Sequence, residues 1–130
     1  MFESPRSVLF NNDRPTPHYL ELSCERYGDT TLVRMSGELD IACEEYFERS
    51  IRPLEQQGGW IVLDLSGLTF MDSTGLRLLL RAWDHSRRDG FQLAVLPGAG
   101  PARRTLEVSG LNRVLPIVED APLSYPAAMS

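Results

Sequence analysis

A serine near the middle of the chain is the residue with the clearest potential for chemistry. Ser73 stands in the run Asp-Ser-Thr-Gly-Leu, residues 72–76, after a buried-strand pattern and at the start of a helical one. A hydroxyl there lies beside unpaired backbone N–H groups and can reach the active site of another protein. Ser73 could be a nucleophile or a substrate for phosphorylation. Its position alone favours a third reading, that Asp72 or Ser73 only caps the helix.

Gly75 is an unusual residue for the first turn of a helix. Glycine in a helix costs up to about 1 kcal/mol relative to alanine, so its presence needs a reason. The reason we expect is the close approach of a partner or of a neighbouring loop. In open α/β sheets, ligands and partners usually bind at the edge where strands lead into helices.

Catalysis by Ser73 itself is not expected. A serine nucleophile needs a base, and the chain has only two histidines, His18 and His85. His85 lies 12 residues further along the same predicted helix, about 18 Å away at about 1.5 Å per residue. All 13 basic residues are arginine, which also excludes a lysine-dependent receiver site at Asp64 and a phosphate-binding loop of the Walker type. We therefore expect a protein that is not an enzyme, with no cofactor and no metal site.

Composition narrows the class of protein further. The chain has 130 residues, enough for one domain, with 42% hydrophobic and 24% charged residues, as in ordinary globular proteins. A net charge of -5 argues against nucleic-acid binding. No apolar run is long enough to cross a membrane, and the N-terminus lacks a signal-peptide core, so we expect a cytoplasmic location. Cys24 and Cys43 suggest neither a disulfide framework nor a zinc site.

The first half of the domain predicts a hairpin and a helix. Alternating apolar residues over 19–26 and 31–35 predict two strands joined by a turn at Gly28-Asp29. Residues 36–40 should break the second strand, and Asp40 should cap the helix that follows. Pro53 should kink or split that helix before Gly58-Gly59 ends it.

The second half predicts strands joined by helical crossovers. Residues 60–65 form an apolar run typical of a central strand, and 67–72 should be a connection. The helix from Thr74 should bury an apolar stripe and end at Asp89-Gly90. A strand over 91–96, a short helix from Pro101 and an edge strand over 114–118 complete the order β-β-α-β-α-β-α-β. The residues expected to face inward on the two helices are Leu76, Leu79, Leu80 and Trp83, then Ala102, Leu106 and Val108.

These patterns define a fold class and three segments. The fold class is an α/β sandwich with a mixed sheet, an N-terminal hairpin plus parallel strands, and helices packed on it. Residues 1–17 read as a flexible leader, residues 18–118 as the domain and residues 119–130 as a tail. Pro122 and Pro126 interrupt the tail, so at most a short or irregular final helix is expected there.

Two segments of the sequence resemble the STAS domain of bacterial anti-anti-sigma factors, also called anti-sigma factor antagonists. They are Ser-Gly-Glu-Leu-Asp, residues 36–40, and the run from Ile61 to Leu76 that contains Asp-Ser-Thr-Gly-Leu. The resemblance implies that the unphosphorylated chain binds an anti-sigma factor with serine kinase activity and so frees a sigma factor. It also implies that phosphorylation ends this binding and that a phosphatase reverses it.

The resemblance also assigns roles to residues. It makes Ser73 the phosphoacceptor, with Thr74 as the alternative acceptor. We expect Asp72, Asp40 and Asp64 to lie on one rim. The partner-binding positions that it implies are Gly37, Asp40, Asp64, Asp72, Thr74 and Gly75.

A second reading of the family remains open. The chain could be a STAS-type module that docks in a larger signalling or transport complex, or holds a small ligand, without any switch. Ser73 would then be only a helix cap. Binding to a kinase-type anti-sigma factor that disappears on phosphorylation would separate the two readings.

Overall fold

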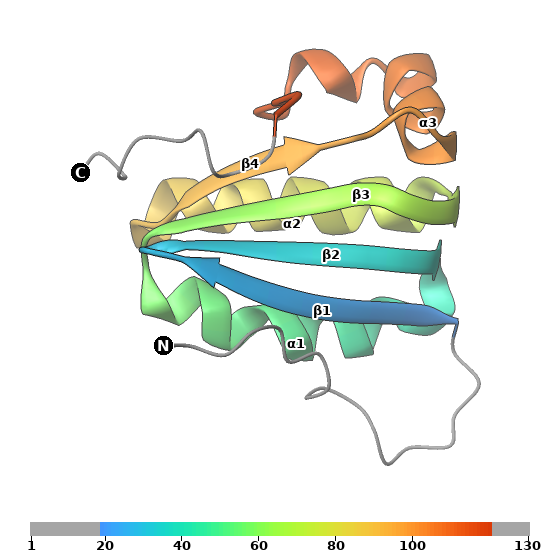
Figure 1. Cartoon of the computed structure of the whole chain (residues 1–130). Helices are drawn as coiled ribbons and strands as arrows, with labels where there is room; N and C mark the ends of the chain where they lie inside the picture. The colour runs from blue at the N-terminus through green and yellow to red at the C-terminus, as the bar shows by residue number, and fades with distance from the viewer. Residues whose placement is uncertain (1–18, 121–130) are drawn as a thin grey trace.

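The computed structural model describes residues 19–120 of the chain. The predicted leader, residues 1–17, and residues 121–130 of the predicted tail lie outside the described residues. Within 19–120 the chain forms one mixed sheet with two long helices on one face and a shorter helix at one edge (Figure 1). The predicted α/β class is therefore confirmed.

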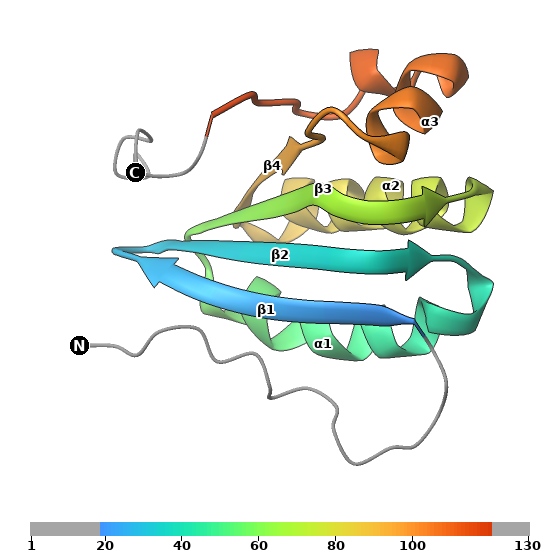
Figure 2. The same cartoon turned by 45° about the vertical axis from the view of Figure 1, so that its right-hand side comes forward.

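The sheet has four strands in the order β1-β2-β3-β4. β1 and β2 form the antiparallel hairpin that the sequence predicts, and β2, β3 and β4 are parallel. Two long helices connect the parallel strands and lie side by side on the same face of the sheet (Figure 2). The strands are β1 (Leu20–Tyr27), β2 (Thr30–Leu39), β3 (Trp60–Met71) and β4 (Gln92–Leu96). The helices are α1 (Glu44–Gln57), α2 (Ser73–Asp89) and α3 (Pro101–Ser109), with short 3-10 turns η2 (Ile41–Cys43) and η3 (Leu111–Arg113).

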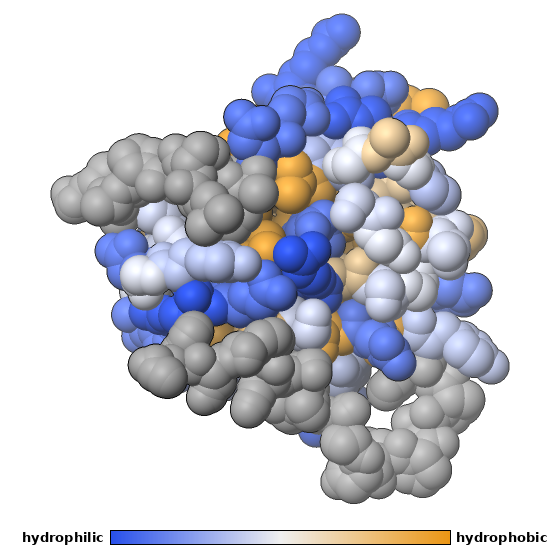
Figure 3. Space-filling model, viewed as in Figure 1, coloured by the Kyte–Doolittle hydropathy of each residue, from blue (hydrophilic) through white to orange (hydrophobic). Residues whose placement is uncertain are grey.

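The main core lies between the sheet and the helices. Alternate residues of the strands, such as Val33, Leu63 and Val95, pack there against buried residues of α1 and α2. The opposite face of the sheet carries no helix and holds a smaller cluster around Leu32 and Val62. Figure 3 shows this second face, where apolar side chains gather near the centre and strongly hydrophilic ones lie among them.

Both central strands are longer than the sequence predicts. β2 continues through residues 36–39 and β3 through residues 66–71, so the expected break and the expected connection are wrong. The two extensions pair with each other, with shifts of register between Arg34 and Ser36 and between Gly37 and Glu38. The polar residues and glycines in these stretches are typical of loops. They form strand here because hydrogen bonds between the two neighbouring strands satisfy their backbone N–H and C=O groups.

The helices differ from expectation in three details. α1 runs without a break through Pro53, which lies exposed near its end, so the predicted split is wrong. On α2 the buried stripe is displaced from the predicted one: it contains Gly75, Leu78 and Ala82, while Leu76, Leu80 and Trp83 are only partly buried. Leu79 is buried as predicted. Val108 does not face inward, because it is 82% exposed.

The predicted edge strand over 114–118 is reduced to a single bridge. Val95 of β4 donates its N–H to the carbonyl of Pro116 and accepts from the N–H of Val118, both at 2.9 Å. Proline at 116 has no N–H to extend the ladder, which agrees with its place at the sheet edge. Among the described helices, none combines the length and the apolar character needed to cross a bilayer.

Candidate functional site

Ser73 is the first residue of α2 and lies exposed at the end of β3. The residue before it caps the helix: Oδ1 of Asp72 accepts a hydrogen bond from the backbone N–H of Thr74 at 2.9 Å. No described residue forms a hydrogen bond with the Ser73 hydroxyl. Because Asp72 already does the capping, Ser73 is not needed for it, and its hydroxyl is free to react.

The two residues after Ser73 point into the protein. Thr74 is 8% exposed, and Gly75 is buried. A Cβ at position 75 would overlap the side chain of Met71 and come within 3.2 Å of the Leu39 carbonyl oxygen. The close approach that Gly75 permits is therefore the packing of α2 on the ends of β2 and β3. Ser73 is the accessible hydroxyl of the pair, and Thr74 is not.

The neighbouring turn at the end of β2 has the same construction as the start of α2. Asp40 caps η2, with its Oδ1 accepting from the N–H of Ala42 at 3.0 Å, as the sequence predicts. Asp40 and Asp72 thus stand at two adjacent strand ends, where residues 39 and 71 are partners in the sheet. Among residues 19–120, no basic side chain forms an ion pair with Glu38, Asp40 or Asp72. Arg77, one turn along α2, is engaged by Glu44, so carboxylates outnumber cations at the edge around Ser73.

Asp64 does not share this edge, contrary to expectation. It is 6% exposed in the first half of β3, seven residues before Met71, which is roughly 20 Å along a strand. Its carboxylate accepts from the N–H and hydroxyl of Ser66 at 2.9 and 2.7 Å and lies 3.7 Å from Arg34. These contacts give Asp64 a local structural role on the helix-free face.

Gly37 also has a structural role. Its φ of 101° lies in the region that favours glycine, and a Cβ there would overlap the carbonyl oxygen of Tyr19. This close approach lets the N–H of Glu38 donate to the same carbonyl at 3.0 Å. Gly37 therefore fixes the β1–β2 pairing next to the acidic edge.

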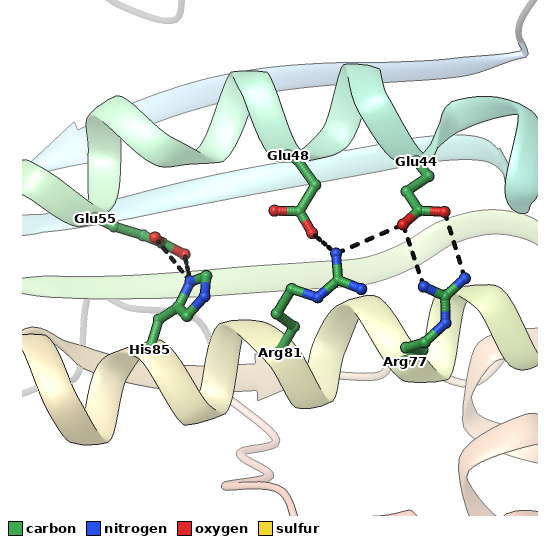
Figure 4. A network of polar contacts seen from close by, with 6 residues as sticks. All are labelled: Glu44, Glu48, Glu55, Arg77, Arg81 and His85. Atoms are coloured by element: carbon green, nitrogen blue, oxygen red, sulfur yellow. Dashed lines mark hydrogen bonds and ion pairs between the residues drawn. The ribbon is translucent and has the colours of Figure 1, made fainter.

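A network of charged side chains holds α2 against α1 (Figure 4). Arg77 donates to both carboxylate oxygens of Glu44, at 3.1 and 3.3 Å, and this contact lowers the pKa of Glu44. Arg81 bonds Glu48. Nδ1 of His85 lies 3.2 Å from Oε1 of Glu55, whose pKa is raised because its carboxylate is buried. The network fixes the helix that presents Ser73.

The same network places His85 where it cannot act on Ser73. His85 contacts Glu55 on α1, in the C-terminal half of α2, whereas Ser73 starts that helix. His18 lies outside the described residues. Within residues 19–120, no three His, Cys, Asp or Glu side chains gather in a way that could hold a metal ion.

Sequence reasoning missed two exposed apolar residues at this edge. Ile41 follows the cap Asp40, and Phe70 precedes Met71 at the end of β3; they are 70% and 44% exposed. The only signal in the sequence is a large apolar residue directly beside a predicted cap or turn. Their exposure depends on the extended pairing of β2 and β3, which local sequence patterns do not predict.

Comparisons with known proteins identify the family of the domain. Residues 21–121 match the model of the STAS domain family. The chain is 33% identical over 103 residues to the anti-sigma F factor antagonist of Paenibacillus polymyxa, covering 78% of this chain and 88% of that protein. It is 28% identical over 88 residues to an anti-sigma-B factor antagonist of Staphylococcus aureus, covering 67% and 82%.

A solved structure supports the same assignment. The crystal structure of an anti-sigma factor antagonist from Mycobacterium paratuberculosis superimposes with a TM-score of 0.66 at 26% identity, over 81% of this chain and 90% of that one. The family match spans nearly all of the described residues, so the resemblance noted in the sequence is confirmed. The chain belongs to the STAS domain family.

Proposed function

We propose that this chain is an anti-sigma factor antagonist that switches by phosphorylation of Ser73. Unphosphorylated, it binds an anti-sigma factor that is also a serine kinase, and a sigma factor is set free. The observation that carries the proposal is the Ser73 hydroxyl, exposed and without a hydrogen bond to any described residue, at the start of a capped helix. The relatives named as anti-sigma factor antagonists supply the class of partner.

The charge of a phosphoryl group explains how the switch would work. It adds about -1.5 to -2 charges at neutral pH to an edge that already holds Asp40 and Asp72. The start of α2 partly offsets that charge within the domain, so the fold should survive. Burying the same charge against a partner costs desolvation and repulsion, and a few kcal/mol lost there is about a hundredfold or more in affinity.

The remaining parts of the machinery belong to other proteins in this proposal. The kinase partner supplies the catalytic groups, and a phosphatase restores the free hydroxyl. The chain itself is a substrate and a binding protein, and a cytoplasmic location fits partners that act on transcription.

Mass spectrometry after incubation with the partner kinase and ATP tests the acceptor. We expect one phosphate on Ser73, none on the Ser73→Ala variant, and normal phosphorylation of Ser36→Ala, a control that removes another exposed serine. Phosphate on Thr74 alone would overturn the assignment to Ser73. Binding that is equally tight before and after phosphorylation would favour the non-switching STAS module.

A further inference from the structure

Large apolar side chains are concentrated at the edge that carries Ser73. The structure exposes five of them among residues 19–120, and three lie where β1, β2 and β3 end or begin beside the start of α2. We call these three residues, Tyr19, Ile41 and Phe70, the strand-end patch. They are 66%, 70% and 44% exposed. Val108 on α3 and Val114 after η3 are the other two.

The sheet aligns two members of the strand-end patch. The carbonyl of Tyr19 accepts from the N–H of Glu38, and Glu38 is paired with Phe70. Their neighbours Leu20, Leu39 and Met71 are buried in the main core, whereas Tyr19 and Phe70 stay exposed at this end of the sheet. Strands lie about 4.8 Å apart, so the row across three strands spans about 10 Å.

Ile41 reaches the same edge from the other side. It begins η2, two residues after Leu39, whose carbonyl oxygen lies against Gly75 in the first turn of α2. Phe70 is three residues before Ser73 in the chain. Ile41 and Phe70 therefore flank the start of α2, one from the β2 end and one from the β3 end.

A protein that acts on Ser73 has to contact the surface around it. A kinase has to bring its bound nucleotide to the Ser73 hydroxyl, and a standard interface buries about 800 Å² on each partner, a disc roughly 30 Å across. Phe70 is three residues from Ser73, and Ile41 follows the neighbouring strand end, so an interface of this size around Ser73 can include both. Exposed apolar residues with charged neighbours are typical of binding surfaces, and aromatic or large aliphatic side chains near the centre usually supply most of the affinity.

We propose that Ile41 and Phe70 are the apolar anchors through which the chain binds its kinase-type anti-sigma factor, each entering an apolar pocket of that partner. This inference rests on the proposed function and deepens it. The anchors supply affinity that does not depend on charge, while Ser73 between them supplies the control. The acidic side chains of the same edge remain around the anchors and contribute the part of binding that salt weakens.

Alanine variants of the anchors test the proposal. With the unphosphorylated chain and the purified anti-sigma factor, we expect Ile41→Ala and Phe70→Ala each to raise Kd by about tenfold or more. Val114→Ala, an exposed apolar control that is 52% exposed, should stay within about twofold of wild type. Ile41→Leu and Phe70→Leu should recover most of the affinity. Ile41→Ala should unfold near the wild-type temperature, because Ile41 is 70% exposed, and Phe70→Leu, which keeps most of the apolar contact, shows whether any loss in Phe70→Ala comes from the fold.

A kinetic measurement separates anchoring from an effect on the fold or on Ser73. In the phosphorylation reaction the anchor variants should raise KM for the chain and leave kcat nearly unchanged, since the anchors contribute the same binding before and during phosphoryl transfer. Their loss of affinity should also be equal at low and high salt.

The outcomes distinguish this inference from the proposed function. If the wild-type chain binds no anti-sigma factor, the proposed function and the anchors are both refuted. If wild type binds and phosphorylation releases it, but Ile41→Ala and Phe70→Ala bind as tightly as wild type, the switch stands and the anchors are refuted. An equal loss in Val114→Ala would also refute the anchors.

Discussion

The acidic edge around Ser73 and the contact between α1 and α2 use the same residue types in opposite ways. Along the α1–α2 contact carboxylates face cations, as Glu44 faces Arg77 and Glu48 faces Arg81. At the edge, Asp40 and Asp72 accept from backbone N–H groups, and Asp40 also from the Cys43 thiol, but no cation pairs with them among the described residues. Apolar side chains are likewise buried beneath α1 and α2 but exposed at the edge, as Ile41 and Phe70 are.

This difference separates residues that hold the fold from residues that are available to a partner. Paired charges and buried apolar groups already contact partners within the chain, so they are not available to another protein. A capping carboxylate keeps most of its charge for the surroundings, and an exposed Phe or Ile keeps its apolar area. The free Ser73 hydroxyl stands among such residues, so a change there alters the surface and leaves the packing intact.

Gly37→Ala should produce the largest effect, because it breaks the backbone that supports the acidic edge. The new Cβ would overlap the Tyr19 carbonyl, and the residue would have to keep a φ of 101°. We expect a loss of about 3 kcal/mol in the free energy of unfolding, measured by urea denaturation. The control is Gly28→Ala: its φ is 66° but no atom lies within 4 Å of the added Cβ, so it should cost about 1 kcal/mol. Equal losses would contradict the close approach at Gly37.

Asp72→Ala should have the next largest effect, since it removes the cap of the helix that presents Ser73. We expect a loss of about 1 kcal/mol in stability by urea denaturation. Asp72→Asn keeps an acceptor for the Thr74 N–H and removes only the charge, so its stability should stay near wild type. A loss in Asp72→Asn as large as in Asp72→Ala would show that the charge itself stabilises the fold.

Glu55→Gln should change how stability depends on pH. Burial raises the pKa of Glu55, so the native state holds its proton to higher pH than the unfolded chain does. Stability from this group is complete below the ordinary glutamate value and is lost as pH rises through the raised pKa. Glu48, Arg52 and His85 are the charged groups that act on it.

The expected result is that the stability of Glu55→Gln, relative to wild type, increases with rising pH. Relative to wild type, Glu55→Gln should become more stable as pH rises above the ordinary pKa of glutamate, as followed by thermal unfolding. His85→Gln is a matched control: it replaces the ring that contacts Glu55 at 3.2 Å and keeps the buried carboxylate, so the pH dependence that comes from Glu55 should persist. A stability difference between Glu55→Gln and wild type that does not change with pH would contradict a pKa of Glu55 raised by burial.

Arg77→Gln should have the smallest effect. Its side chain and that of Glu44 are 47% and 29% exposed, and pairs of this kind contribute little in water. We expect a small decrease in unfolding temperature at low salt that disappears at about 1 M salt. A large decrease in unfolding temperature that salt does not reduce would show that Arg77 stabilises the α1–α2 contact by more than an exposed ion pair.

Much of the fold could be predicted because local patterns agree with it. Alternating apolar residues predicted the hairpin, which the structure contains. Asp40 and Asp72 cap η2 and α2, the helical segments that follow them, and Gly90 ends α2. The extensions of β2 and β3 could not be predicted, since Ser36, Gly37 and Gly67 are typical of loops and become strand only by pairing with each other. The edge strand over 114–118 failed for the reverse reason: its pattern suits a strand, but only one bridge forms.

The site could be predicted only in part, for a similar reason. Ser73 and Asp72 follow one another in the sequence, so local pattern and family resemblance locate them together. Whether Asp64 joins them depends on where β3 ends, and the longer strand separates them. Gly75 was noticed for its cost in a helix, yet its cause, the Leu39 carbonyl, lies on another strand.

The most direct test is the affinity of the anti-sigma factor for two forms of the chain, measured by calorimetry at one salt concentration. One form is unphosphorylated and the other carries phosphate on Ser73, with circular dichroism confirming that both are folded. We predict tight binding of the first and a loss of about a hundredfold or more in the second. Equal affinity of the two folded forms would contradict the switch at Ser73.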